Sequence, residues 1–446
     1  MLIDLESEGG RVAESGDCCP GPSPRREFLK VGFLSGLGLS LGDYFSLRAA
    51  CASTGIKDPP ADSAILIFLD GGLSHLESFD PKPEAAIDIR GDLGKVRTNT
   101  GEYFGGLFPE TAQVADKIAV IRSVNHIEKF HDRAKNNMLT GHETKPEIIF
   151  PSYGSVVSHE LGMRANLPAY TCIPRIEDPA LGYGYLGSAH GAFSIEGEPL
   201  HEGFAVKDLN LPKGVNADRM DQRRTLLEAV DGHFKKLEHS EAVASMDEHY
   251  ERAYALVSSK SAREAFDIAA EPQAIRDEYG DSLMGQRLLL ARRLVEGGAR
   301  FVTIFDRGWD LHENLKREME NRAPGFDRGY AALIRDLDRR GMLDRTLVIL
   351  ATEFGREIRI NNLAGRHHWW RAFSVVLAGG GAKKGIVYGK TDDRAAEILE
   401  HPVSPEDLAA TIFTQLGIAP GKKLISPGER PVDIAGKGSI LFEVLA

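Results

Sequence analysis

The sequence is poor in cysteine, has no excess of basic residues and contains no long apolar run in its main part. Only 4 of its 446 residues are cysteine, so a fold held together by several disulfides is excluded. The net charge of −11 argues against a nucleic-acid-binding protein, which would present a basic face. After residue 60 no stretch of about 20 apolar residues occurs, so we expect no transmembrane span in the mature chain. Internal repeats and low-complexity tracts are also lacking.

What is present is the composition of an ordinary globular protein. Hydrophobic residues make up 42% of the chain and charged residues 27%, which is enough to build a buried core. The length suits one large α/β domain or two smaller ones.

The N-terminal segment resembles a twin-arginine export signal. Residues 24–30 read Pro-Arg-Arg-Glu-Phe-Leu-Lys, and a glycine-rich, weakly apolar stretch follows them. This order is typical of such a signal, although Pro24 stands where a hydroxyl residue is usual. The other interpretation is a surface helix with a basic start. We expect a signal over residues 1–50, a linker over 51–62, recognition by the twin-arginine export machinery, and a periplasmic or extracellular location.

Two cysteines would remain after cleavage behind Ala50. Cys51 would then begin the mature chain, but Arg48 stands where a lipid-attachment site prefers an aliphatic residue, so we do not expect a lipid anchor. Cys51 and Cys172 could form one disulfide in an oxidising compartment.

Three apolar runs each lead into an acidic residue. The runs at 64–70, 301–305 and 346–352 lead to Asp70, Asp306 and Glu353. Continuous apolar runs of this length suit strands that are buried on both faces of a parallel sheet. In open α/β sheets, ligands bind beyond the carboxyl ends of the strands. We therefore expect a clustered carboxylate site at this edge, and a metal is the usual reason to cluster carboxylates.

Helical and extended patterns alternate along the chain, as they do in βαβ units with right-handed crossovers. Further strands are expected at 117–122 and 373–378, and helices at 130–140, 284–296, 326–340 and 405–416. Residues 150–215 lack periodicity and are interpreted as long excursions over the sheet, and residues 216–270 as charged helices. The expected architecture is one α/β domain over residues 63–446, with a mostly parallel central sheet, helices on both faces and a helical or loop insertion at about 150–280.

Several side chains near the expected strand ends suit metal or anion chemistry. Asp70 borders two glycines, which let a ligand approach the backbone closely, although a turn-forming role is the alternative. Asp310 and His312 are two residues apart, which puts both side chains on one side of an extended segment, and both residue types bind zinc or manganese. Arg356 follows Glu353 by three residues. It could neutralise a phosphate or sulfate oxygen, or simply pair with Glu353.

The remaining histidines of interest lie in two places. Residues 365–370 contain the adjacent His367 and His368 beside two tryptophans. In a loop, one of these histidines can bind a metal while the other donates to a substrate. The alternative is a surface loop with its aromatic side chains packed down. His131 stands near the expected start of a helix, whose free N–H groups form an anion site.

Five segments in fixed order resemble the sulfatase-like family called domain of unknown function 1501, which is placed in the alkaline phosphatase-like superfamily. These segments are residues 69–75, 79–83, 309–312, 352–356 and 365–369. The resemblance extends over about residues 24–446. It implies an α/β fold like that of alkaline phosphatases and sulfatases.

Matched position by position, the resemblance also implies a metal site. The site would hold one or two divalent ions, with zinc, manganese and calcium as the candidates. The implied ligands are Asp70, Asp310, His312, Glu353 and His368.

Three positions depart from the superfamily pattern. Phe354 stands where a ligand, His or Asn, is usual, so one of the two ions would be weakly held or absent. His131 stands where sulfatases have the cysteine of a Cys-x-Pro-x-Arg segment, so formylglycine chemistry is not expected. His131 could be a nucleophile, a metal ligand or a general base, and Ser74 is an alternative nucleophile. His367 replaces the usual Asp before the late histidine and adds a nitrogen at the site.

Three hypotheses on function follow. The first is an exported metal-dependent hydrolase of phosphate or sulfate esters, acting on an anionic small-molecule or polymer-linked substrate, with His131, Arg356 and His367 as catalytic residues. The second is a non-catalytic secreted binding or structural protein with a degenerate metal site, which Phe354 motivates. The third is a phosphomutase or phosphotransferase that carries the transferred group on His131.

Overall fold

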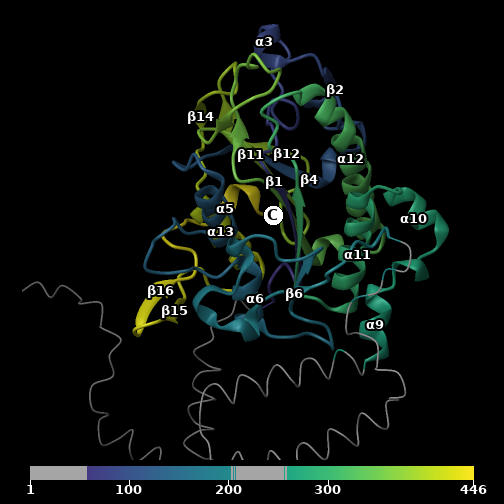
Figure 1. Cartoon of the computed structure of the whole chain (residues 1–446), viewed down its shortest axis with the longest axis vertical. Helices are drawn as coiled ribbons and strands as arrows, with labels where there is room; N and C mark the ends of the chain where they lie inside the picture. The colour runs from purple at the N-terminus through teal and green to yellow at the C-terminus, as the bar shows by residue number, and fades with distance from the viewer. Residues whose placement is uncertain (1–57, 202–203, 205, 207–255, 257–258) are drawn as a thin grey trace, which may run out of the picture. The chain divides into compact units, whose positions relative to one another are not determined.

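An eight-stranded, mostly parallel sheet forms the centre of the computed structural model (Figure 1). The strand order is β12-β4-β11-β8-β1-β7-β5-β6. Strand β11 is antiparallel to both of its neighbours, and the other neighbouring strands are parallel. The bounds are β1 (Ser63–Asp70), β4 (Ile118–Val124), β5 (Tyr170–Ile173), β6 (Phe193–Ser194), β7 (Phe301–Arg307), β8 (Thr346–Ala351), β11 (Phe373–Ala378) and β12 (Ile386–Tyr388).

The structure describes residues 58–201, 204, 206, 256 and 259–446. The expected export signal, most of the expected linker and most of the charged region at 216–270 lie outside these residues. Within them, no helix combines the length and the apolarity needed to cross a membrane.

Helices cover both faces of the sheet, as expected for the α/β class. One face carries α9 (Lys260–Phe266), α10 (Gln273–Tyr279), α11 (Leu283–Gly297) and α12 (Leu315–Arg339), and the other carries α5 (His131–Thr140), α6 (Tyr153–Leu161) and α13 (Pro405–Gln415). Figure 1 shows α11 and α12 on one side of the strands and α5 and α13 on the other. The predicted fold class, a mostly parallel sheet with helices on both faces, is confirmed.

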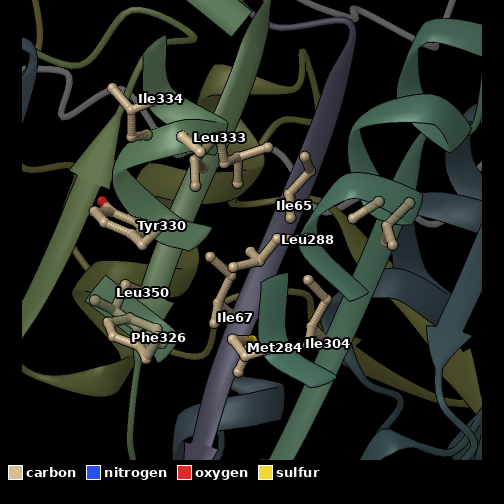
Figure 2. Close-up of a cluster of buried hydrophobic side chains, with 14 of the residues drawn as sticks. Ile65, Ile67, Met284, Leu288, Ile304, Phe326, Tyr330, Leu333, Ile334 and Leu350 are labelled. Carbon is tan, nitrogen blue, oxygen red and sulfur yellow. The ribbon is translucent and has the colours of Figure 1, made fainter. Parts of the chain in front are cut away.

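The alternation of side chains along β1 builds both hydrophobic cores. Ile65 and Ile67 point to the face of α11 and α12, where Figure 2 shows them beside Leu288 and Met284. The intervening Leu66 points to the opposite core. Because β1 is covered on both faces, nearly every one of its residues is buried, and each large apolar side chain contributes roughly 1.5–3 kcal/mol to folding. This explains why the run reads as continuously apolar rather than alternating.

Most expected elements lie where the sequence predicts them. The strands near 117–122, 346–352 and 373–378 correspond to β4, β8 and β11. Helix α5 ends at Gly141 in the left-handed conformation, with φ of 71°. Helix α13 begins with a capping box, in which the Ser404 hydroxyl accepts from the Asp407 N–H and the Asp407 carboxylate accepts from the Ser404 N–H.

Helix α12 is longer than expected, because it begins at Leu315 rather than near residue 326. Pro324 lies inside it, and an internal proline removes one backbone hydrogen bond and favours a helix break. The apolar residues before the proline nevertheless keep the helical spacing, since Leu315, Met319 and Ala323 are four residues apart and all are buried. Their burial against the sheet outweighs the local cost of the proline.

The expected long excursions at 150–215 are corrected by the structure. This region contains helix α6 and two strands of the central sheet, β5 and β6. Strand β5 pairs in parallel with β7, and β6 forms the sheet edge. Both strands are too short, at 4 and 2 residues, to give a periodic signal in the sequence.

Further short helices and strand pairs lie outside the central sheet, besides seven short 3-10 helices in the described part of the chain. They are α3 (Ile87–Arg90), α4 (Pro109–Ala112), and the paired short strands β2 (Lys95–Arg97) with β3 (Tyr103–Gly105), β9 (Gly355–Arg356) with β10 (His368–Trp369), β13 (Lys390–Thr391) with β14 (Ile398–Glu400), and β15 (Lys423–Ser426) with β16 (Arg430–Asp433). The β9–β10 pair matters most for function, because it brings His368 opposite Arg356.

The thiol of Cys172 in β5 is expected to be unreactive in the folded protein. Its Sγ is buried and donates to the Arg175 carbonyl, and burial raises its pKa to about 12. Since the thiolate is the reactive form, little of it is present at pH 8. We expect protein reduced beforehand to resist iodoacetamide at Cys172 until denaturant is added, measured by mass spectrometry of the Cys172 peptide. Rapid labelling without denaturant would contradict this burial.

Candidate metal centre

The carboxyl ends of three neighbouring strands bring the candidate acids together. Strands β8, β1 and β7 are adjacent and parallel. Asp70 is the last residue of β1, Glu353 follows β8, and Asp310 follows β7. These acids therefore lie at one edge of the sheet, as the parallel arrangement predicts. Asp306, at the end of β7, lies elsewhere, because its carboxylate accepts from Arg287 and from the Trp309 indole.

The turn after β1 fixes the positions of the acids relative to one another. The Gly71 N–H donates to Glu353 Oε1 at 2.8 Å, and the Trp309 N–H donates to the Asp70 carbonyl at 3.1 Å. Gly71 has φ of 122°, and a Cβ there would lie 2.2 Å from the Asp310 backbone nitrogen. Glycine is therefore required for the segment that carries Asp310 to pack against β1.

His131, the first residue of α5, lies between two of the acids. Its Nδ1 is 2.6 Å from Glu353 Oε1, and its Nε2 is 3.3 Å from Asp310 Oδ2. Burial lowers the pKa of His131, but its interactions with Asp310 and Glu353 outweigh burial and raise the pKa to about 9. Glu353 is fully buried, so its carboxylate is held firmly against the imidazole.

A second set of histidines surrounds Asp310. His312 Nε2 lies 3.0 Å from Asp310 Oδ1, and His368 Nε2 lies 3.2 Å from the same oxygen. The two Nε2 atoms are 2.9 Å apart. Burial alone would raise the pKa of Asp310, but His131, His368 and Arg356 hold it well below its usual range. The expectation that Asp310 and His312 share one side is met, and His368 joins them from β10.

Two ligand groups result, and they share His131. We call His131, Asp310 and His368 the histidine group, and Asp70, His131 and Glu353 the carboxylate group. Within each group the candidate ligand atoms all lie within 4.8 Å of one another. His312 adjoins the histidine group through its contacts with Asp310 and His368. All five residues expected as ligands and His131 therefore lie in one continuous centre.

The geometry of the histidine group fits a bound cation. In a tetrahedral site with bonds of about 2.0–2.1 Å, neighbouring ligand atoms lie roughly 3.3 Å apart. The contacts of Asp310 with His131, His312 and His368 are 3.0–3.3 Å. His131 Nε2 and Asp70 Oδ1 are also buried, and each has one charged neighbour at 3.3 Å, Asp310 Oδ2 and Lys135 Nζ respectively. The donor set therefore suits a divalent ion.

Arg356 has a different role from the substrate contact considered above. Its side chain is fully buried and donates to the carbonyls of Gly72 and Arg366 and to Asp310 Oδ1, the last at 2.5 Å. Burial lowers the pKa of this guanidinium, and Asp310 opposes that effect. Arg356 thus holds Asp310 from the interior of the protein, and its own side chain has no exposed surface.

Phe354 occupies the place next to Glu353 and packs against the imidazoles. Its ring centroid lies 4.3 Å from that of His368 and 4.9 Å from that of His131. Phe354 is fully buried, so it forms an apolar wall of the centre and supplies no ligand.

The segment that carries His367 and His368 is anchored by a buried ion pair. Arg366 and Glu77 are both buried, and Arg366 Nη2 lies 2.5 Å from Glu77 Oε1. The Arg366 N–H donates to the Leu311 carbonyl, which ties this segment to the one that carries Asp310 and His312. His367 is exposed at the outer side, with its Nδ1 3.1 Å from His312 Nδ1.

Ser74, the alternative nucleophile, is not available to a substrate. It is buried, and its hydroxyl donates to the Glu77 carboxylate. Its position next to the strand end therefore reflects the anchoring network rather than catalysis.

Sequence reasoning missed three residues of the centre. Lys135 is buried, with Nζ 3.3 Å from Asp70 Oδ1 and 2.5 Å from Asp178 Oδ2. His126 Nε2 lies 2.6 Å from the Glu353 carbonyl oxygen. The spacing of four between His131 and Lys135 puts both on one face of α5, and this signal was available in the sequence. Asp178 lies in an irregular segment, and no sequence pattern indicated that it would join the centre.

Comparisons with known proteins agree with the family resemblance. A family model described as a protein of unknown function (DUF1501) matches residues 61–445. No curated protein matches the chain. The chain is similar to a phosphonate monoester hydrolase from Silicibacter pomeroyi, with 13% identity, 86% of this chain and 76% of that chain covered, and a TM-score of 0.35.

Two further solved structures are similar at the same level. For a sulfatase from Pseudoalteromonas sp., the identity is 13%, the coverage is 89% of this chain and 72% of that chain, and the TM-score is 0.36. For a protein in the alkaline phosphatase superfamily from Vibrio parahaemolyticus, the identity is 10%, the coverage is 82% of this chain and 73% of that chain, and the TM-score is 0.37. Likeness at this level carries no argument about function, which must come from the side chains of the centre.

Proposed function

The chain belongs to the family of proteins of unknown function DUF1501, and for this member we propose an exported, metal-dependent hydrolase of phosphate or sulfate esters. The observation that carries the proposal is the histidine group, in which three side chains from α5, the segment after β7 and β10 converge on one point. Clusters of this kind at a sheet edge serve metal-assisted hydrolysis.

The donor set favours one divalent ion at the histidine group. His131, His312 and His368 offer ring nitrogens, and Asp310 offers a carboxylate oxygen. A set rich in imidazole suits zinc or manganese better than calcium, which prefers oxygen ligands. A divalent ion bound there would neutralise an oxygen of an anionic ester and lower the pKa of a bound water.

Neighbouring side chains orient the proposed ligands. Glu353 lies at His131 Nδ1, so a proton held on that nitrogen leaves the Nε2 lone pair free to bind a metal. Similarly, His368 Nδ1 lies 3.0 Å from the Lys129 carbonyl oxygen, which favours a free Nε2. Both imidazoles therefore present Nε2 to the centre, and this supports the role of ligand for His131 over that of nucleophile.

Two further features would hold the anionic ester. Helix α5 begins at His131 without a side-chain cap on its first turn, so its first N–H groups remain for an anion. His367, exposed beside His312, is the proposed donor to an ester or leaving-group oxygen. With Ser74 buried and no cysteine at position 131, water is the proposed nucleophile.

The test is ion content followed by turnover. The mature protein, purified after export from its host, would be stripped with chelator, and its affinity for zinc, manganese and calcium would be measured. Aryl phosphates, phosphodiesters and aryl sulfates would then be offered with each ion. We expect one ion per chain and turnover of at least one ester class that chelation abolishes.

Absence of both ion binding and turnover would favour the non-catalytic alternative that Phe354 motivates. Trapping of an acid-labile phosphoryl group on His131 would instead favour the phosphotransferase alternative, because a ligand histidine would not carry it.

Export by the twin-arginine machinery is part of the proposal and is carried by residues 24–30. Replacing Arg25 and Arg26 together by lysine is expected to retain the protein in the cytoplasm, while Arg48→Lys leaves export intact. Cell fractionation with an antibody against the mature chain measures this. Equal export of the double variant would contradict the signal.

A further inference from the structure

We propose that the ammonium group of Lys135 is the resident cation of the carboxylate group, so that the centre takes one divalent ion and not two. This inference rests on the proposed function, because it concerns the second of the two ligand groups. It assigns Lys135 as a positioning residue that holds Asp70 and limits the number of ions.

The position of Lys135 is unusual for a lysine. It is 7% exposed, and its Nζ lies between Asp178 Oδ2 at 2.5 Å and Asp70 Oδ1 at 3.3 Å. Lysine is almost never buried unless it is paired. The side chain comes from the turn of α5 after His131, so the helix directs it to the carboxylate group.

Cations of the chain already contact the carboxylate group. Asp70 contacts Lys135, and Arg307 Nε lies 3.7 Å from Asp70 Oδ2 and 2.8 Å from Glu177 Oε2. Glu353 is held by the Gly71 N–H and by His131. A divalent ion bound to Asp70 would lie within a few ångströms of the Lys135 ammonium and would be strongly repelled.

The histidine group differs in this respect. Its own cation, Arg356, contacts Asp310 Oδ1 and also donates to backbone carbonyls beneath the centre. Asp310 Oδ2 faces His131 Nε2 instead. The ring nitrogens of His131, His368 and the adjoining His312 also lie 3.0–3.3 Å from the Asp310 carboxylate there. The histidine group is therefore suited to a divalent ion, and the carboxylate group is suited to an ammonium.

The arrangement also explains why position 354 can hold a phenylalanine, which binds no metal. A second ion would lack a ligand at position 354, and the Lys135 ammonium removes the need for that ion. An ammonium needs only oxygen acceptors, which Asp70 and Asp178 supply.

The experiment counts ions in the full-length mature protein. Wild type, Lys135→Met and Lys135→Arg would be equilibrated with excess zinc or manganese, desalted, and analysed for metal per chain. Lys145→Met, which removes an exposed lysine, is the matched control. We expect one ion in wild type, Lys135→Arg and Lys145→Met, and two in Lys135→Met, with anomalous scattering from the second ion at Asp70 and Glu353.

Two ions in wild type, or a single ion in folded Lys135→Met, would overturn the inference. If Lys135→Met does not fold, Lys135→Gln replaces it in the experiment. Two ions are again expected in this variant, and a single ion in folded Lys135→Gln would overturn the inference. Absence of any bound ion in wild type would instead contradict the proposed function. Failure of the proposed function and failure of the inference on Lys135 are therefore distinguishable.

Discussion

Replacing Asp310 by asparagine is expected to lower the affinity for zinc or manganese by about 100-fold or more and to abolish turnover. Asp310 contacts His131, His312 and His368 at 3.0–3.3 Å. An amide keeps the shape but removes the charge that a divalent ion needs, and even loss of an outer partner of a metal ligand costs roughly 10–100-fold in affinity. Isothermal titration of chelator-treated protein measures the change.

Asp306→Asn is the matched control for this variant. Asp306 is also an acid at the end of β7, but it pairs with Arg287 and lies in neither ligand group. Its replacement should leave ion affinity within about threefold of wild type, since its charge is already matched by Arg287. Equal losses in both variants would mean that the acids act through folding and not as ligands.

The second large effect concerns stability. Arg366→Met is expected to lower the free energy of unfolding by about 3–5 kcal/mol, because it leaves the Glu77 carboxylate buried without its partner. Glu77 and Arg366 are 3% and 0% exposed, and Arg366 also donates to the carbonyls of Ile89 and Glu357. Urea unfolding followed by circular dichroism gives the difference.

The surface offers a matched pair for comparison. Arg371 and Glu397 are 2.7 Å apart, but their side chains are more than half exposed. Arg371→Met should change stability by no more than about 1 kcal/mol. Because Arg366 anchors the segment of His368, the folded fraction of Arg366→Met should also bind the ion more weakly. Equal stability of both variants would refute the anchoring role.

The central strands were predictable because a strand buried on both faces has a continuous run of apolar residues. The run that ends at Asp70 is apolar at every internal position, and so is β8; the neighbouring β7 is apolar over 301–305 except at Thr303. Once these strands are parallel neighbours, the convergence of Asp70, Asp310 and Glu353 follows from topology alone.

Other features depend on contacts that no local pattern encodes. Arg356 donates to the carbonyl of Gly72, 284 residues away in the sequence, so its burial could not be inferred from its place beside Glu353. Strands β5 and β6 are too short to stand out. Helix α12 begins eleven residues before the predicted start at 326, because burial of its first turns outweighs the effect of Pro324.

The position of Lys135 could be predicted only in part. Its spacing from His131 on α5 was visible, but its partner Asp178 comes from an irregular segment 43 residues further on. The resemblance to a known family implied a set of ligands that did not include the lysine. The packing of α5 against the sheet edge brings Lys135 to Asp70.

The most direct test of the account is a crystal structure of the wild-type mature protein equilibrated with manganese or zinc, measured at the absorption edge of the metal. We expect an anomalous peak at the histidine group, about 2.0–2.2 Å from His131 Nε2, His368 Nε2 and an Asp310 oxygen. A fully soaked crystal with no peak at this position, or with its only peak elsewhere, would contradict it.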